Sequence, residues 1–522
     1  MATHIAAARV HGRRLRHVVA LLTQEWRALD ELVRIPAVPR RTVEELLAVL
    51  GDDVEQRGDR WRLAPARAEA YRARFALDAL PALDQAAALT SHTDLLDRVR
   101  SDVAAVPPPL AALDHVQATP ESVLRRALWL AENYDLDGAR LLLLGDHDLT
   151  SLAACAVAPG LSVTVVDLDE RVLEFVDRIA RERGYDIRCL HADLRFGLPP
   201  AATEWADLVF SDPPYTPEGM GLFAARGLSA LREPELGRLA LVYGYSDRAP
   251  ALGLKVQQEL QRLGLVFEAV LPAFDRYQGA QAVGSASSLY VCQPTARSRK
   301  LAERPQVAIY THGPQSVEGA GAAGERARAE LVRIAAAAEH RVEGVRGPGW
   351  DKPLTVPAGQ ALAVDASADP GPWLLRTLLA SNARRVAVLV GNSHPDLANE
   401  QGQHALAAPL AAKFRLRYLR STPEPKSAVV VAEEVPVESL APADRVVRHL
   451  LDRAHGKIGN IWREALVAAS GGALTKNAAR DRIAAASEAA GLRAHELAVR
   501  LVDLPRHRLG AALAAVRDSQ AG

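Results

Sequence analysis

Acidic residues follow several predicted strands in one stretch of the chain, where they could bind a cationic ligand. The loop at 145–148 reads Gly-Asp-His-Asp, and the segment at 167–169 reads Asp-Leu-Asp. Asp193 follows a third predicted strand, and a fourth ends in Asp-Pro-Pro-Tyr at 212–215. In an open α/β sheet, ligands bind at the carboxyl ends of the strands. These acids are therefore candidates for a ligand site at that edge.

The loop at 145–148 differs from phosphate-binding loops, which offer glycines and exposed backbone amides. Gly145 supplies a tight turn, but Asp146 and Asp148 flank the loop with carboxylates. Such carboxylates repel a phosphate or a substrate carboxylate and attract an ammonium group. This pattern argues against NAD and FAD and favours a cofactor that ends in a cation.

An acid at the end of the second strand of this fold accepts hydrogen bonds from ribose hydroxyls. Asp167 or Asp169 could have that role. The alternative is that Asp169 caps the helix that follows. The upstream acid Asp148 favours the ligand interpretation, but the sequence leaves both open.

The segment Asp212-Pro213-Pro214-Tyr215 predicts a rigid turn, because proline fixes φ and removes an amide donor. The Asp212 carboxylate and nearby carbonyl groups can then accept hydrogen bonds from an amine. Tyr215 can stack on or cap the reacting group. Such a turn could orient or deprotonate a nitrogen nucleophile beside an electrophilic sulfonium. The alternative is an ordinary proline-rich turn.

Strands and helices alternate over residues 119–297, which predicts a parallel, doubly wound Rossmann-like sheet. Residues 1–80 predict two helices and a hairpin, typical of a winged-helix-like module, with Thr42 as a helix cap. That module could bind nucleic acid. However, the acids of its second helix would face phosphates, so a docking or dimerisation module is the favoured interpretation.

The remaining segments complete a multidomain α/β architecture. Residues 81–118 contain Pro81 and three prolines at 107–109, so they are predicted to be a linker. Residues 298–440 predict a second α/β domain, and 441–522 predict a helical domain. His394, in a loop of the second domain, is expected to be a capping or structural residue.

The composition of the 522 residues argues against several classes of function. Lys and Arg total 63, as do Asp and Glu, so the net charge of zero weakens a nucleic-acid function. The three cysteines form no CxxC motif, and no metal site is expected. No apolar run approaches the roughly 20 residues of a membrane span, so a cytoplasmic protein is expected.

Five stretches resemble the branched-chain polyamine synthases, the N4-bis(aminopropyl)spermidine synthases. They are LGDHDLTS (144–151), VVDLDERVLEFV (165–176), HADLRFGLP (191–199), SDPPYTPEGMGLFAARGLSAL (211–231) and FDRYQGAQAVGSASSLYVCQPT (274–295). With the N-terminal module, the resemblance covers about residues 10–297. The combination is specific, whereas Asp-Pro-Pro-Tyr alone also occurs in amino-methyltransferases.

The resemblance implies an aminopropyltransferase that uses decarboxylated S-adenosylmethionine, without a metal. The acceptor would be a linear polyamine such as spermidine, 5′-methylthioadenosine would be released, and the enzyme would be a homodimer. Asp212 would accept the amine and act as general base, with Pro213 and Tyr215 positioning it. Other roles implied for this chain are ammonium binding by Asp146 and Asp148, ribose binding by Asp167 and Asp169 beside Leu168, adenine binding by Asp193 beside Leu194, and an acceptor site at Tyr277 and Ser285. The alternative for Asp193 is a place in the polyamine channel.

One residue departs from the family pattern, because His147 stands where the family loop has a third aspartate. The change removes a negative charge or makes the loop charge depend on pH. Intact S-adenosylmethionine is then also conceivable as the donor, with transfer of a methyl or 3-amino-3-carboxypropyl group. The favoured interpretation is that position 147 points away from the ligand. Two further alternatives are an N-methyltransferase acting on nucleic acid and a non-catalytic polyamine sensor.

Overall fold

A computed structural model describes residues 1–7, 12–80, 89, 92–134, 136–302, 309–310, 323–369 and 371–520. The chain forms two compact units. The first unit comprises Met1–Val163 and Ala206–Glu303, and the second comprises Thr164–Trp205 and Arg304–Gly522. Each unit therefore contains segments that are far apart in the sequence.

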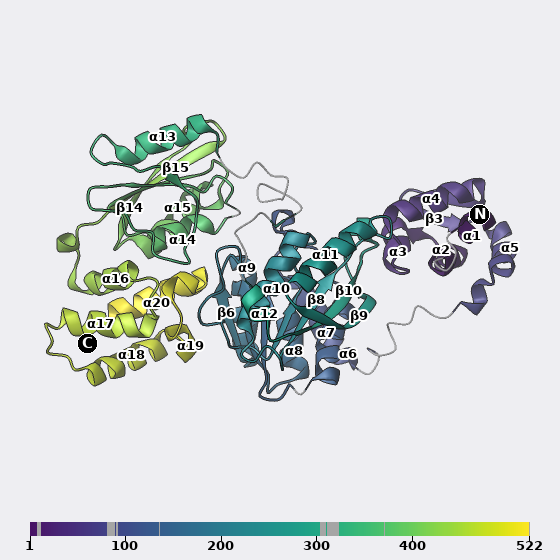
Figure 1. Cartoon of the computed structure of the whole chain (residues 1–522), viewed down its shortest axis with the longest axis horizontal. Helices are drawn as coiled ribbons and strands as arrows, with labels where there is room; N and C mark the ends of the chain where they lie inside the picture. Colours follow the sequence, from purple (N-terminus) through teal and green to yellow (C-terminus); the bar gives the residue numbers. More distant parts are fainter. Residues whose placement is uncertain are drawn as a thin grey trace. The chain divides into compact units, whose positions relative to one another are not determined.

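The predicted Rossmann-like sheet is present, but the expectation of a parallel sheet is wrong at one edge, because β10 runs antiparallel to both of its neighbours (Figure 1). Its seven strands have the order β6-β5-β4-β7-β8-β10-β9. They are β4 (Arg140–Leu144), β5 (Ser162–Asp167), β6 (Ile187–His191), β7 (Leu208–Ser211), β8 (Arg238–Tyr243), β9 (Leu265–Arg276) and β10 (Ala286–Pro294). β7 pairs in parallel with β4 and β8, and β10 is antiparallel to β8 and β9.

Helices connect these strands as the alternating sequence pattern predicts. They are α7 (Pro120–Asn133), α8 (Thr150–Val157), α9 (Glu170–Arg183), α10 (Pro217–Ala230), α11 (Pro250–Arg262) and the short α12 (Ser298–Leu301). Thr119 caps α7 by accepting a hydrogen bond from the backbone N–H of Ser122, and Pro120 occupies the first turn. This cap fixes the start of the helix that carries Arg126.

The N-terminal segment contains the predicted second helix and hairpin. Its elements are α1 (Ala2–Ala7), α2 (Gly12–Gln24), β1 (Arg27–Ala28), α3 (Leu29–Arg34), α4 (Arg40–Leu50), β2 (Val54–Arg57), β3 (Arg60–Leu63) and α5 (Pro65–Phe75). The predicted Thr42 cap is wrong, because the extended Pro39 precedes the helix directly and α4 begins at Arg40. The winged-helix assignment stays a prediction.

Side-chain contacts of α4 favour the docking interpretation of this segment. Arg248 donates from Nε to the Thr42 hydroxyl over 3.2 Å and forms an ion pair with Glu45. Arg40 donates to the Gln281 side-chain oxygen. Helix α4 is the helix that would enter a DNA groove. Its side chains instead contact residues 248 and 281 of the same unit.

The linker prediction for residues 81–118 is wrong for Thr93–Ala105, which form helix α6. Leu96, Val99 and Val103 are buried on one face of α6, at the spacing of a helix stripe. The prediction gave weight to prolines and overlooked this stripe. The three prolines follow the helix after Val106, and Pro81 lies outside the described residues.

The second sheet predicted for residues 298–440 is also present. It has the order β11-β12-β13-β15-β14 and consists of β11 (Val345–Arg346), β12 (Leu362–Asp365), β13 (Arg385–Gly391), β14 (Phe414–Leu419) and β15 (Ser427–Glu434). The accompanying helices are α13 (Glu325–Ala336), α14 (Trp373–Ala380) and α15 (Glu400–Ala407) (Figure 1).

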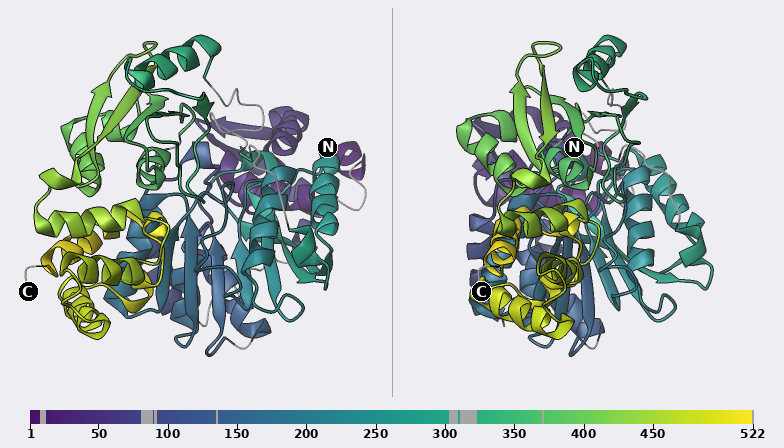
Figure 2. Two further views of the ribbon diagram at one scale, coloured as in Figure 1. Left: turned by 60° about the vertical axis from the view of Figure 1, so that its left-hand side comes forward. Right: turned by 90° about the vertical axis from the view of Figure 1, so that its left-hand side faces the viewer.

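The C-terminal residues are helical, as the sequence predicts. They form α16 (Pro442–Asp452), α17 (Ile458–Ala469), α18 (Lys476–Ala489), α19 (Ala494–Leu497) and α20 (Arg506–Asp518). Helices α16, α17, α18 and α20 pack together in the yellow-green part of Figure 2. Within the described ranges, no helix has the length and apolar character needed to cross a bilayer.

Candidate functional site

Arg126 lies at the centre of a buried cluster of acids in the first unit. It sits on the buried face of α7 with a side chain that is 1% exposed. Its guanidinium contacts Asp148 at 2.9 Å, Asp212 at 2.7 Å and Asp275 at 3.0 Å. Three carboxyl groups therefore share one positive charge. We call Arg126, Asp148, Asp212 and Asp275 the carboxylate cluster.

The sheet brings two of these acids to one edge. Asp148 follows β4 and Asp212 follows β7, and these parallel strands are paired with Leu144 opposite Ser211. Asp148 is also held by the chain before α7, because its Oδ1 accepts a 2.7 Å hydrogen bond from the Ala118 backbone N–H. Both acids thus have fixed positions, as the alternation of strands and helices predicts.

Two tyrosines extend the cluster through their hydroxyl groups. Tyr277 donates a 2.7 Å hydrogen bond to Oδ2 of Asp212, and its oxygen lies 2.9 Å from the Ser287 hydroxyl. Tyr215 donates to the Tyr277 hydroxyl over 3.0 Å. The structure therefore brings together Asp212, Tyr215 and Tyr277. Ser285 is buried, and its backbone oxygen accepts from the Tyr277 N–H.

Burial of the cluster changes the protonation of its acids. Desolvation raises the pKa of Asp212 to about 7; Arg126 opposes this shift, and the charges of Asp148 and Asp275 add to it. Burial likewise raises the pKa of Asp275 against the effect of Arg126. Asp212 is consequently an acid whose proton can be exchanged near neutral pH.

The first loop holds its residues by local contacts. Asp146 accepts hydrogen bonds from the backbone N–H of Ser151, at 3.2 Å, and from the Ser151 hydroxyl. The His147 ring places Nε2 3.0 Å from the Pro107 carbonyl oxygen and lies 4.7 Å from the His115 ring. The His147 ring therefore faces the chain at 107–115, which favours the interpretation that position 147 points away from a ligand.

The predicted ribose-binding acids belong to the second unit. Asp169 caps α9 by accepting from the Arg171 backbone N–H, and its carboxylate pairs with the Arg171 side chain at 2.6 Å. The capping alternative for Asp169 is thus confirmed. Asp167 accepts a 2.8 Å hydrogen bond from the Asp169 backbone N–H, and Leu168 between them is buried. Their contact with a ribose stays a prediction.

Asp193 is held by more partners than the sequence indicates. Its carboxylate accepts from the backbone and side chain of Arg195 and from the indole N–H of Trp373, which lies 3.0 Å away. Leu194 beside it is buried. Nothing in the sequence links Trp373 to Asp193, because 180 residues separate them.

His394 is a capping residue, as predicted. Its Nδ1 accepts a 3.1 Å hydrogen bond from the Asp396 backbone N–H at the start of a short 3₁₀ helix. Its Nε2 lies 3.0 Å from a carboxylate oxygen of Asp369. Both ring nitrogens are engaged in local contacts.

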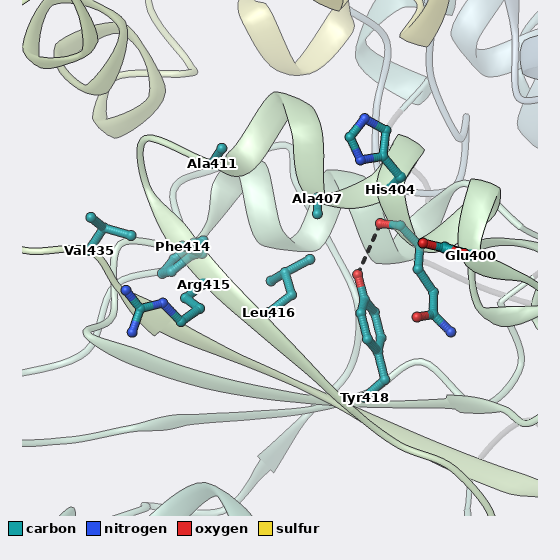
Figure 3. Close-up of a pocket in the computed structure, with 10 residues that line it drawn as sticks. Glu400, His404, Ala407, Ala411, Phe414, Arg415, Leu416, Tyr418 and Val435 are labelled. Atoms are coloured by element: carbon teal, nitrogen blue, oxygen red, sulfur yellow. Dashed lines mark hydrogen bonds between the residues drawn. The ribbon is translucent and has the colours of Figure 1, made fainter. Parts of the chain in front are cut away.

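A surface pocket of about 550 Å³ lies between α15 and the edge strand β14 (Figure 3). Its lining includes Glu400, His404, Phe414, Arg415, Leu416 and Tyr418. Tyr418 donates its hydroxyl to the Gln403 backbone oxygen, as the dashed line shows. The predicted site residues do not line this pocket. Across the described parts of the chain, no group of three or more His, Cys, Asp or Glu side chains forms a metal site.

One known protein family matches the middle of the chain. Residues 94–303 match the family model of the branched-chain polyamine synthase A C-terminal domain. The predicted family resemblance is confirmed over this range. The chain is longer than the branched-chain polyamine synthases that it resembles.

Curated relatives each match part of the chain. An N(4)-bis(aminopropyl)spermidine synthase of Thermococcus kodakarensis is 30% identical over 195 residues, which cover 36% of this chain and 54% of the relative. One from Thermus thermophilus is 40% identical over 126 residues, or 24% of this chain and 36% of the relative. An uncharacterized protein of Methanocaldococcus jannaschii is 32% identical over 218 residues, or 42% and 54%. The chain thus spans about half the length of these relatives, or less.

A solved structure is also similar. The crystal structure of the branched-chain polyamine synthase from Thermus thermophilus, in complex with N4-aminopropylspermidine and 5′-methylthioadenosine, is 24% identical. The match covers 58% of this chain and 92% of that chain, with a TM-score of 0.42.

Sequence reasoning missed two members of the carboxylate cluster. Arg126 had a visible signal, because it falls on the apolar stripe of α7 with Val123, Ala127 and Leu130. An arginine in such a stripe needs buried anions. Asp275 gave no comparable signal, since it lies inside β9 and meets Arg126 only after the fold has formed.

Proposed function

We propose that this protein transfers an aminopropyl group from decarboxylated S-adenosylmethionine to an amine nitrogen of a spermidine-like polyamine. The observation that carries the proposal is the carboxylate cluster. Its three carboxyl groups share the single positive charge of Arg126, so acidic groups outnumber cationic groups in the cluster. A polycationic amine supplies the missing positive charge. The family match over residues 94–303 supports the same reaction.

Asp212 is the base in this proposal. An ammonium must lose a proton before its nitrogen can attack, and the pKa of Asp212, raised to about 7 by burial, suits a general base at neutral pH. The nitrogen then forms a bond to the propyl carbon attached to the sulfonium, and the carbon–sulfur bond breaks. The electron pair remains on sulfur, so 5′-methylthioadenosine leaves as a neutral thioether.

The remaining residues bind and orient the two substrates. Tyr277 fixes the Asp212 carboxylate through its 2.7 Å hydrogen bond, and Tyr215 acts through Tyr277. Pro213 and Ser285 shape the acceptor side. We assign the aminopropyl ammonium to the acids of the first loop and the nucleoside to the loops after β5 and β6. These assignments involve Gly145, Asp146, Asp148, Asp167, Leu168, Asp169, Asp193 and Leu194.

The contacts of His147 favour the decarboxylated donor. A ring that faces the Pro107 carbonyl leaves the carboxylates of Asp146 and Asp148 to set the charge of the loop. A donor that retained its own carboxylate would be repelled by these acids. Decarboxylation removes that repulsion and leaves an ammonium.

Mass spectrometry of the reaction products tests the proposal. Purified full-length protein is incubated with spermidine and either decarboxylated or intact S-adenosylmethionine. We expect one or two added aminopropyl units, formed with the decarboxylated donor only. A methyl or aminocarboxypropyl product from the intact donor would overturn the proposed donor. A complete absence of product with spermidine and its linear analogues would overturn the proposed activity.

A further inference from the structure

Helix α14 contacts two parts of the second unit that follow strands β5 and β6. Trp373 donates its indole N–H to Asp193 in the loop after β6. Arg376, which is fully buried, forms an ion pair with Glu170, the first residue of helix α9 after β5. Trp373 and Arg376 are three residues apart, so they lie on the same face of the helix. One face of α14 therefore contacts both the loop after β6 and the start of α9.

Arg376 also donates hydrogen bonds to the chain that precedes helix α20. Its Nη1 donates to the backbone oxygens of Val502, at 3.1 Å, and Leu504, at 2.8 Å. The Arg506 backbone N–H donates to the second oxygen of Glu170 over 2.8 Å. Glu170 is thereby bound to both helix α14 and the first residue of helix α20. The position of α14 relative to these loops is fixed by buried, charge-assisted contacts.

Both oxygens of the Asp193 carboxylate accept hydrogen bonds from neighbouring residues. Arg195 donates to it three times, from its backbone N–H, Nε and Nη2, and Trp373 supplies a fourth hydrogen bond. Two carboxylate oxygens offer about four lone-pair sites. With all of them engaged, the side chain fixes the course of the backbone from Asp193 to Arg195 and offers no vacant position to a nucleobase.

Aromatic packing encloses the same loop. Phe196 contacts the rings of Trp350 and Trp373, with centroids 4.8 Å and 5.4 Å apart. The guanidinium of Arg195 lies 4.9 Å from the Trp373 ring and 5.3 Å from the Tyr310 ring. Trp373 therefore touches the loop by its N–H and by its ring face. These two contacts can be separated by substitution.

We propose that Trp373 is a positioning residue for the donor: through Asp193 it holds the loop at 193–196 in the shape that receives the adenosine part. This role rests on the proposed function, because the loop is assigned to the nucleoside there. Asp193 then acts by shaping the loop around Leu194, and its carboxylate does not itself bind adenine. Helix α14 thereby contributes to donor affinity.

The test compares Trp373→Phe with a matched control in the full-length protein. Phenylalanine keeps an aromatic ring and removes the N–H. The control is Trp462→Phe, since Trp462 is fully buried and donates its N–H to the Ser519 hydroxyl over 2.9 Å. Calorimetry measures the Kd of 5′-methylthioadenosine and of S-adenosylhomocysteine. We expect a roughly tenfold higher Kd in Trp373→Phe, the effect of losing a hydrogen bond to a charged group. The control should keep the wild-type Kd.

Two further readouts separate positioning from general damage. The donor KM should rise in Trp373→Phe while kcat stays within about twofold, because the loss is one of binding. In an Asp193→Ala background, which lacks the acceptor of the indole N–H, Trp373→Phe should change Kd by less than about twofold, because the two residues act as one unit.

The outcomes distinguish this proposal from the proposed function. An unchanged or lower Kd in Trp373→Phe, or an equal rise in Trp462→Phe, overturns the role of Trp373 and leaves aminopropyl transfer standing. A wild-type protein that binds S-adenosylhomocysteine but not 5′-methylthioadenosine contradicts the aminopropyl donor, and Trp373 is then judged on S-adenosylhomocysteine. Binding of neither nucleoside by the wild type overturns the positioning role.

Discussion

The guanidinium of Arg126 and the carboxylate of Asp212 form a 2.7 Å ion pair, but Arg126 divides its charge among three acids. A carboxylate with an arginine to itself usually has a lowered pKa. Asp212 instead has a pKa raised to about 7, because burial and the charges of Asp148 and Asp275 outweigh the arginine. Burial, which a shared arginine only partly offsets, thus converts an ordinary acid into a base that works near neutral pH.

Replacing Asp212 by Asn should abolish transfer. The amide has nearly the same shape but cannot take the proton, so kcat should fall by at least about 100-fold. Calorimetric binding of 5′-methylthioadenosine should remain close to wild type. Asp444→Asn is the control, because its partner Arg517 is on the surface. A near wild-type rate in Asp212→Asn would remove Asp212 from the mechanism.

The rate of transfer should rise with pH around the pKa of Asp212. The base works only when it is ionised, so kcat/KM should increase about tenfold per pH unit below pH 7 and level off above it. Steady-state rates from pH 5 to 9 at saturating donor measure this profile. A rate independent of pH across 6–8 would contradict the assignment of the base.

The contribution of Asp212 to the stability of the fold should fall as the pH rises, whereas the rate of transfer should increase. The pKa of Asp212 is higher in the folded protein, about 7, than its ordinary value of 3.8, so folding retains a proton that the unfolded chain releases. Stability from this group is full below about pH 4 and is lost as the pH rises to 7. Asp212→Asn should therefore have a higher Tm than wild type at pH 8 and a similar Tm at pH 4. A lower Tm for the variant at pH 8 would refute this account.

Removing the positive charge of Arg126 should lower the free energy of unfolding most strongly at high pH. Arg126→Met leaves three buried acids without their shared charge, which should destabilise the fold by about 3 kcal/mol at pH 8. At pH 5 the acids can bind protons, so the loss should be smaller. Urea unfolding at both pH values measures the difference. Equal losses at pH 5 and 8 would mean that packing, and not charge, explains the effect.

The sequence predicted the strands and their acids more reliably than the partners of those acids. Alternating elements put Asp148 and Asp212 at one edge because parallel strands share a direction. The links from Arg126 to Asp275 and from Asp193 to Trp373 join residues 149 and 180 positions apart. Such contacts depend on the packing of distant segments, which local periodicity does not encode. The prolines at 107–109, which follow α6, favoured a linker and outweighed the short apolar stripe of that helix.

The residues of the second unit also constrain how the protein is made. Glu170 bonds to Arg506, 336 residues later, and Arg181 bonds to Glu496, 315 residues later. On the ribosome, the segment from Thr164 to Trp205 emerges long before these partners are synthesised. The side chains of Glu170 and Arg181 therefore lack these partners until the last part of the chain is made, and such late, long-range contacts slow folding and favour aggregation of the nascent protein. Production in a host with ample chaperones should therefore increase the soluble yield.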